Sequence, residues 1–141
     1  MKTIISHSSQ GTNLFGQKLA ASLKGGEIFA LIGDLGAGKT VLAKGLAKGL
    51  GVKSRVNSPT FNILKLYSVK NHQNIKYFCH VDAYRLNSAP DLEAIGVKDF
   101  LEDKQVVTLI EWAEKIKPLL PKGSKIIKIE HLTDNSRKIN Y

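Results

Sequence analysis

The segment from residue 27 to residue 50 constrains the fold more than any other part of the sequence. A compact apolar run (EIFALI, 27–32) has the pattern of a strand buried on both faces. A glycine-rich loop follows with the spacing Gly33-x4-Gly38-Lys39-Thr40, and apolar residues then recur with helical spacing over 41–50. Glycines let backbone N–H groups converge on an anion, and the next helix presents its positive dipole end to the same anion. The pattern therefore predicts a strand–loop–helix unit that binds nucleotide phosphates.

Two residues of this loop have specific expected roles. The Lys39 ammonium should reach the β- and γ-phosphates, and the Thr40 hydroxyl should coordinate Mg²⁺. The chain has no Asn-Lys-x-Asp motif for reading guanine, and few arginines to surround a transferred phosphate. These observations favour ATP and Mg²⁺ as cofactors and argue against a small-molecule kinase. The nucleotide-binding residues predicted in this segment are Gly33, Asp34, Leu35, Gly36, Ala37, Gly38, Lys39, Thr40 and Val41.

The rest of the chain alternates between expected strands and helices. The expected strands are 2–5, 62–69, 75–81, 106–110, 125–132 and 137–141; the expected helices run from Ser8–Ser9 to Gly25–Gly26, over 90–103 with a break at Gly96, and over 113–120. This alternation predicts an α/β fold, the three-layer P-loop NTPase fold, with a mostly parallel central sheet and antiparallel edge strands. A length of 141 residues fits one domain spanning 1–141.

The net charge of +9 favours acidic partners such as nucleotides, RNA or an acidic protein face, although a solvated lysine-rich surface is the alternative interpretation. The single cysteine, Cys79, cannot form an internal disulfide, which fits a reducing compartment. The first six residues contain too few apolar side chains for a signal segment, and no run of 18 apolar residues occurs. We therefore expect a cytoplasmic protein.

Two carboxylates follow expected strands. Glu111 ends the apolar run 106–110, where such proteins often place an acid that holds Mg²⁺; alternatively it is an N-terminal charge of the next helix. Asp82 follows the strand 75–81 and could bind metal-bound water or act as a general base, or simply meet solvent at the strand end. His80 and Asp82 could also form a transition-metal pair, but no further Cys or His cluster supports one. The predicted metal ligands are Thr40, Glu111 and Asp82, and the predicted catalytic residues are Lys39, Asp82 and Glu111.

The loop Asn57-Ser58-Pro59-Thr60-Phe61 lies where NTPases often place a nucleotide-sensing switch. Thr60 could supply a hydroxyl to Mg²⁺ when a γ-phosphate is present, whereas a plain Ser-Pro turn is the alternative. Trp112, the only tryptophan, follows Glu111 and should lie near the nucleotide, either stacked on a partner surface or anchoring the next helix.

Four motifs together resemble the TsaE family, formerly YjeE. They are GDLGAGKT at 33–40, VNSPTF at 56–61, HVDAYRL at 80–86 and IEW at 110–112. Thr12, Gly16, residues 92–96 and Arg137 also match, so the resemblance covers nearly the whole chain. Val41 departs from the family pattern, which usually has a second threonine there.

The resemblance implies a P-loop ATPase for synthesis of the tRNA modification N6-threonylcarbamoyladenosine, weak in isolation. In this family the protein docks on a TsaB–TsaD pair, where TsaD modifies adenosine 37 of tRNAs reading codons that begin with A. ATP turnover is thought to reset the assembly rather than make the group, and tRNA is an indirect or nearby ligand.

Residue roles are also implied by the resemblance. Lys39 and Thr40 hold phosphate and Mg²⁺, Glu111 completes the metal site, and Asp82 is the catalytic-site acid. Ser58 and Thr60 form the switch, and Arg85 contacts a partner or a phosphate. Thr12 and the segment near Asn135 are expected beside the adenine, because the base usually lies near the first helix and the last strands.

Two other function classes stay open. A small kinase would transfer phosphate to a metabolite instead of to water. A non-catalytic, nucleotide-gated binding module would show partner affinity that depends on ATP, with no ADP formed.

Overall fold

A computed structural model describes residues 1–57, 59, 63–86 and 96–141 of the chain. Its strands are β1 (Thr3–Ser6), β2 (Ile28–Ile32), β3 (Leu64–Ser68), β4 (Tyr77–Asp82), β5 (Val106–Glu111), β6 (Lys125–His131) and β7 (Arg137–Asn140). Its helices are α1 (Ser9–Ala20), α2 (Lys39–Leu50), α4 (Val97–Leu101) and the 3-10 helix η1 (Ala113–Leu119). Within the described ranges, no helix has the length and apolarity needed to cross a membrane.

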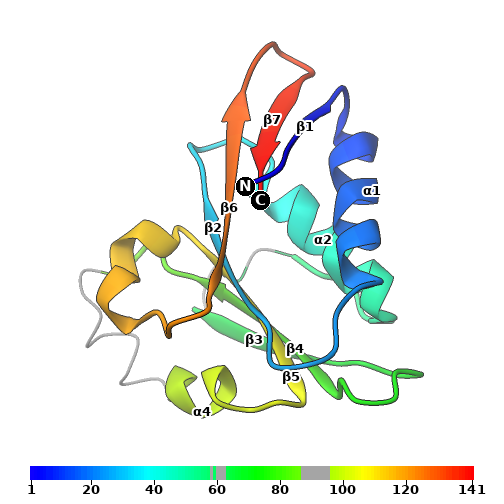
Figure 1. The fold of residues 1–141 in the computed structure, drawn as a ribbon, viewed down its shortest axis with the longest axis vertical. Helices are drawn as coiled ribbons and strands as arrows, with labels where there is room; N and C mark the ends of the chain where they lie inside the picture. The colour runs from blue at the N-terminus through cyan, green and yellow to red at the C-terminus, as the bar shows by residue number, and fades with distance from the viewer. Residues whose placement is uncertain (58, 60–62, 87–95) are drawn as a thin grey trace.

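The described strands form one seven-stranded sheet in the order β1-β7-β6-β2-β5-β4-β3 (Figure 1). β2 pairs in parallel with both β5 and β6, and β5 pairs in parallel with β4. β3 runs antiparallel to β4 at one edge, and β7 pairs antiparallel with β6 and β1 at the other. The predicted parallel centre with antiparallel edges is therefore confirmed.

Helices cover both faces of the sheet, with α1 and α2 on one side and α4 on the other (Figure 1). Side chains of β2 alternate between the two layers, as a strand's period of two requires. Phe29 and Leu31 pack in the cluster that contains the α1 and α2 residues, whereas Ile28 and Ala30 pack with α4 and η1. This arrangement confirms the predicted three-layer fold. It also explains why every residue of β5 is buried.

Two expected helices differ from the structure. The first was expected to reach Gly25–Gly26, but α1 ends at Ala20. The chain then continues in tight turns, and the carboxylate of Glu27 accepts hydrogen bonds from the backbone N–H groups of Lys24 (2.7 Å) and Gly25 (2.8 Å). Because positive φ at Gly25 and Gly26 turns the chain toward β2, the helix cannot extend to them.

The expected helix over 113–120 is a kinked 3-10 helix over Ala113–Leu119. Pro118 lies inside it and has no backbone N–H for a regular helical bond, and Ile116 has non-helical dihedrals. The predicted short helix is therefore present, and the structure adds that it is of the 3-10 type. The expected helix over 90–103 is confirmed only after Gly96, as α4, because residues 90–95 lie outside the described residues.

α1 and α2 cross at glycines. A Cβ atom added at Gly16 would lie 2.6 Å from the Leu42 carbonyl oxygen, and one added at Gly49 would lie 2.6 Å from the Ala20 Cβ. A Cβ at Gly45 would overlap the backbone of α1. The absence of side chains at these positions lets the two backbones approach closely. The N-terminal half of α1 consequently lies against the glycine-rich loop that begins α2.

Candidate functional site

The glycine-rich loop leaves β2 at its carboxyl end and enters α2 at Lys39. Gly36 and Gly38 have φ values of 77° and 106°, which side-chain-bearing residues rarely adopt. Gly33 is required for a different reason, because a Cβ there would lie 2.6 Å from the carbonyl oxygen of Ile129 on β6. The predicted strand–loop–helix unit is thus present, and its glycines are demanded by the backbone path.

Lys39 is the first residue of α2, and its side chain folds back over the loop and is only 5% exposed. Its Nζ donates hydrogen bonds to the carbonyl oxygens of Gly33 (2.5 Å) and Asp34 (2.7 Å). The same ammonium lies 3.9 Å from the ring centroid of Trp112. Burial lowers the pKa of Lys39, while the nearby Glu111 carboxylate acts in the opposite direction. An anion bound beside this ammonium would stabilise its charged form further.

A chain of polar contacts joins α2, β5 and β4. Thr40 Oγ1 donates to Glu111 Oε1 at 3.1 Å, and Glu111 Oε2 lies 2.6 Å from His80 Nε2. His80 and Glu111 are 0% and 2% exposed. Nδ1 of His80 is buried and has no hydrogen-bond partner among the described residues. This fits the tautomer in which the Nε2–H group donates a hydrogen bond to the carboxylate, since only the lone pair of Nδ1 is then left without a partner.

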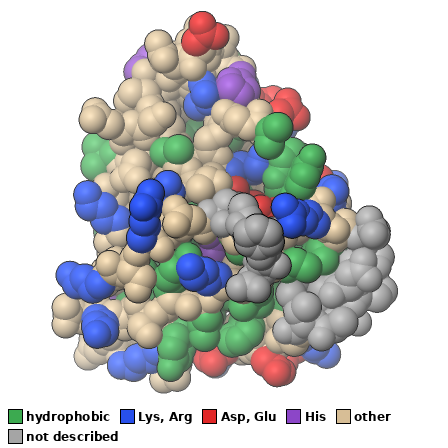
Figure 2. All heavy atoms as spheres, turned by 180° about the vertical axis from the view of Figure 1, so that it is seen from behind, with side chains coloured by type: hydrophobic (Ala, Val, Ile, Leu, Met, Phe, Trp, Pro, Cys, Tyr) green, Lys and Arg blue, Asp and Glu red, His purple; other side chains and the backbone are tan. Residues whose placement is uncertain are grey.

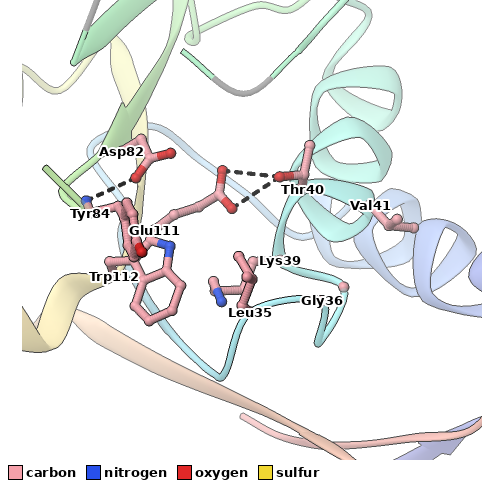
Figure 3. Close-up of a pocket in the computed structure, with 10 residues that line it drawn as sticks. Leu35, Gly36, Lys39, Thr40, Val41, Asp82, Tyr84, Glu111 and Trp112 are labelled. Atoms are coloured by element: carbon pink, nitrogen blue, oxygen red, sulfur yellow. Dashed lines mark hydrogen bonds between the residues drawn. The ribbon is translucent and has the colours of Figure 1, made fainter. Parts of the chain in front are cut away.

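Thr40 and Glu111 line a pocket of about 330 Å³, and its more exposed lining residues Leu35, Tyr84 and Trp112 form the rim. Figure 3 shows the Glu111 carboxylate extending between Asp82 and Thr40. Asp82 and Glu111 are neighbours in the register of β4 and β5. Trp112 adopts a positive φ of 58°, which is rare for an aromatic residue and turns the chain sharply after β5. The turn places its ring against Lys39 and 4.9 Å from the ring of Tyr84.

A second hollow adjoins the first on the other side of the loop. Gly36, Gly38 and Val41 line both hollows, and the second is completed by Ser8, Ser9, Thr12, Asp134, Asn135 and Arg137. Thr12 is buried, and its hydroxyl lies 2.8 Å from the hydroxyl of Ser6. The first helix and the turn before β7 therefore meet beside the loop, and the expectation that Thr12 and Asn135 lie next to the adenine stays a prediction.

Arg137 ties this hairpin to the loop. Its Nε donates to the Ala37 carbonyl oxygen at 2.9 Å, and its Nη2 donates to Gly36 at 3.4 Å. Its Nη1 donates to the carbonyl oxygens of Thr133 and Asp134, both at 3.2 Å. The guanidinium is thus a planar clamp on two backbone segments.

The structure brings most of the predicted site residues together. Leu35, Gly36, Gly38, Lys39, Thr40, Val41, Asp82 and Glu111 line the main pocket, and Gly33, Asp34 and Ala37 complete the loop beneath it. Ser58 and Thr60 lie outside the described residues. Arg85 is exposed in the turn after β4.

Sequence reasoning missed three contributions: the His80–Glu111 contact, the Tyr84 rim and the Arg137 clamp. The sequence signal for the His80–Glu111 contact was the spacing of His80 and Asp82, two residues apart on one strand. The sequence did not show that β5 lies beside that strand. The described part of the chain contains no group of three or more His, Cys, Asp or Glu side chains suited to hold a metal. The partner that the structure gives to His80 is Glu111.

The parallel sheet, with a glycine-rich loop between its central strand β2 and α2, defines a P-loop type α/β protein. Residues 6–139 match the family model of TsaE, described as threonylcarbamoyl adenosine biosynthesis protein TsaE. The chain belongs to the TsaE family.

Individual relatives agree with this assignment. The tRNA threonylcarbamoyladenosine biosynthesis protein TsaE of Bacillus subtilis is 38% identical over 130 residues, covering 92% of this chain and 78% of its own length. The protein of the same name from Treponema pallidum is 36% identical over 135 residues, with 96% of each chain covered. The crystal structure of YdiB from Bacillus subtilis superposes with a TM-score of 0.78 at 32% identity, covering 98% of this chain and 82% of that one.

Proposed function

We propose that this chain binds ATP with Mg²⁺ at its glycine-rich loop and hydrolyses the ATP slowly when alone. Membership of the TsaE family assigns it a part in tRNA threonylcarbamoyladenosine biosynthesis. Within that process we propose that it acts with TsaB and TsaD in forming the group at adenosine 37 of tRNAs reading codons that begin with A. Its ATP turnover would reset that assembly rather than make the group.

The observation that carries the proposal is the meeting of the Thr40 hydroxyl and the Glu111 carboxylate, 3.1 Å apart, beside the buried Lys39 ammonium. The donor set fits the proposed cofactors. Mg²⁺ prefers oxygen ligands and is commonly held by one or two carboxylates together with phosphates and water. Thr40 and Glu111 would hold the ion, with Asp82 at the neighbouring position of β4. When bound, Mg²⁺ would neutralise charge on the phosphates.

The protein's own residues would divide the remaining work. Lys39 would turn from the loop carbonyls to the β- and γ-phosphates, which carry compensating negative charge. The hydrogen bond from His80 holds one oxygen of Glu111, so the other is directed at Thr40. Asp82 would orient the attacking water and accept its proton. The hollow lined by Thr12 and Asn135 would take the nucleoside.

Slow turnover in isolation follows from the placement of arginine. The chain has only Arg55, Arg85 and Arg137, and the guanidinium of Arg137 is already bonded to carbonyl oxygens of the loop. An arginine that stabilises the transferring phosphoryl group commonly raises turnover by about 10³-fold or more. No arginine is among the described residues that line the main pocket, and this suits a slow ATPase that is controlled by its assembly.

The catalytic part of the proposal can be tested by measuring ADP binding by calorimetry and phosphate release from ATP. Lys39→Ala should abolish binding, because the loop loses its buried cation. Glu111→Gln should reduce hydrolysis much more than binding, since it keeps the side-chain volume and removes the charge. Lys44→Ala, an exposed change on the same helix, is the matched control and should leave both unchanged.

Three outcomes would contradict this part. Equal turnover by the Glu111→Gln variant and the parent would remove Glu111 from the mechanism. Phosphate appearing on a metabolite instead of in solution would indicate a small kinase. Partner affinity that depends on ATP, with no ADP formed, would indicate a non-catalytic binding module.

The assembly part needs a separate experiment. Purified chain is mixed with TsaB and TsaD, with and without ATP, and the masses of the species are measured by light scattering. A complex whose population depends on ATP is expected. Identical masses for the mixture and the TsaB–TsaD pair under both conditions would overturn it.

A further inference from the structure

The positive charge of the chain is concentrated in one part of the sequence. Residues 35–81 contain eight Lys and Arg residues and no Asp or Glu, whereas the rest of the chain contains thirteen basic and twelve acidic residues. Lys39 is buried in the glycine-rich loop. The other cations of the segment are all exposed: Lys44, Lys48, Lys53, Arg55, Lys65, Lys70 and Lys76.

Three of these cations line one hollow, which we call the basic groove. Lys44 and Lys48 project from α2, and Arg55 comes from the segment that follows α2. Asn13 of α1 and Ser54 supply polar side chains to the same hollow, whose volume is about 280 Å³. Figure 2 shows Lys and Arg side chains spread over the side of the molecule where α1 and α2 lie. The basic groove shares no lining residue with the two hollows of the candidate site.

The chemistry of the groove distinguishes between two classes of acidic partner. Protein interfaces have a buried core that is rich in aromatic and apolar side chains and poor in lysine. No large apolar side chain between residues 36 and 57, all of which the structure describes, is among the exposed ones. Contacts to a nucleic-acid backbone are instead made by Lys, Arg, Ser and Asn. These residue types supply five of the eight residues that line the groove, and the other three are the small or medium-sized Ala47, Val52 and Val56.

We propose that the basic groove binds the phosphodiester backbone of structured RNA, by direct contact of Lys44, Lys48 and Arg55 with phosphates. The family's role in tRNA modification makes tRNA the natural substrate for the test. Because the groove is separate from the candidate nucleotide site, the contact does not depend on ATP hydrolysis. Binding is insensitive to base sequence, since backbone contacts carry no sequence information.

The expected signature is a dependence on salt. Each phosphate contact contributes a slope of about 1 to the fall of log K with log salt concentration, because bound counterions are released. Replacing the three cations with glutamine should therefore lower that slope by about 3. The affinity for RNA should fall at low salt by the largest factor and converge with the parent at high salt.

The experiment measures fluorescence anisotropy of a labelled, unmodified tRNA transcript at several KCl concentrations, without nucleotide. The test variant is Lys44→Gln/Lys48→Gln/Arg55→Gln. The matched control is Lys98→Gln/Lys117→Gln/Lys122→Gln, which removes the same charge from exposed positions in α4, in η1 and in the turn after η1. Circular dichroism confirms that both variants are folded, and both should retain the parent's ATPase activity.

The proposal is supported if only the test variant binds tRNA more weakly and shows a smaller slope of log K against log salt concentration. Equal losses in both variants would show that net charge alone attracts RNA, and would overturn it. Binding of polyglutamate through the same three residues, with an affinity equal to that for tRNA, would assign the groove to an acidic protein instead. If the parent protein showed no ATPase activity, the proposed function would be contradicted, while the RNA-binding measurement would be unaffected.

Discussion

Replacing Gly16 with alanine should destabilise the protein, although the same change stabilises an isolated helix. In a helix interior, alanine is favoured over glycine by about 1 kcal/mol. In this structure the added Cβ would lie 2.6 Å from the Leu42 carbonyl oxygen and 2.7 Å from the Leu46 nitrogen. Ordinary contact begins at 3.4 Å, so α1 and α2 must separate by about 0.8 Å.

The cost follows from which atoms clash. Both close neighbours belong to the backbone of α2, which cannot turn aside as a side chain could. Overpacking typically costs 1–3 kcal/mol, and a clash with two backbone atoms belongs to the upper part of that range, about 2–3 kcal/mol. Subtracting the helix preference of about 1 kcal/mol leaves a net loss of about 1–2 kcal/mol. For a chain of 141 residues the corresponding fall in Tm is about 3–7 °C.

Urea unfolding followed by far-UV circular dichroism measures the free energy. The control is the pair Lys44→Ala and Lys44→Gly, at an exposed position in the middle of α2, which gives the alanine–glycine difference without any clash. Gly16→Ala should be less stable than the parent while Lys44→Ala is more stable than Lys44→Gly. The close crossing of the helices would be refuted if Gly16→Ala raised the free energy of unfolding by as much as the difference between Lys44→Ala and Lys44→Gly.

Four further outcomes are expected. Backbone hydrogen bonds lower the pKa of Glu27 despite its partial burial. The ionised Glu27 carboxylate therefore stabilises the folded state above about pH 4.5, and this stabilisation is lost as pH falls through the folded-state pKa. Glu27→Gln should make the free energy of unfolding by urea depend less on acid pH. Burial raises the pKa of Cys79 to about 12, so a thiol reagent should label the native protein far more slowly than the urea-unfolded chain, and equal rates would contradict the buried placement. Arg137→Lys keeps the charge but loses the planar clamp on the loop, and should weaken ADP binding by about fivefold, measured by calorimetry, with unchanged affinity as the opposing result. Saturating ADP or ATP should change the fluorescence of Trp112, because the Lys39 ammonium beside its ring would move to the phosphates; no change would place nucleotide elsewhere.

Local sequence patterns predicted much of the fold. The run EIFALI, the glycine spacing and the helical apolar pattern over 41–50 together predicted β2, the loop and α2. These signals are readable because neighbours along the chain determine them. The same local reasoning placed the end of the first helix too late, and it did not show that the short helix containing Pro118 is of the 3-10 type.

Contacts between distant residues could not be read in this way. His80 meets Glu111 only because β4 lies beside β5, and Arg137 reaches Ala37 across 100 positions of the chain. The order of strands in a sheet is set by packing of whole layers, which no single stretch of sequence encodes.

The sequence by itself determined that the chain forms an α/β protein with a glycine-rich loop, with Lys39 and Thr40 at the start of a helix. Only the tertiary structure decided which groups complete that site: the His80 bond to Glu111, the Arg137 clamp and the placement of Thr12 across the α1–α2 crossing. The physical reason is the distance along the chain over which the interactions act. Backbone conformation responds to adjacent residues, whereas a site is assembled by packing forces that act between segments far apart in the chain.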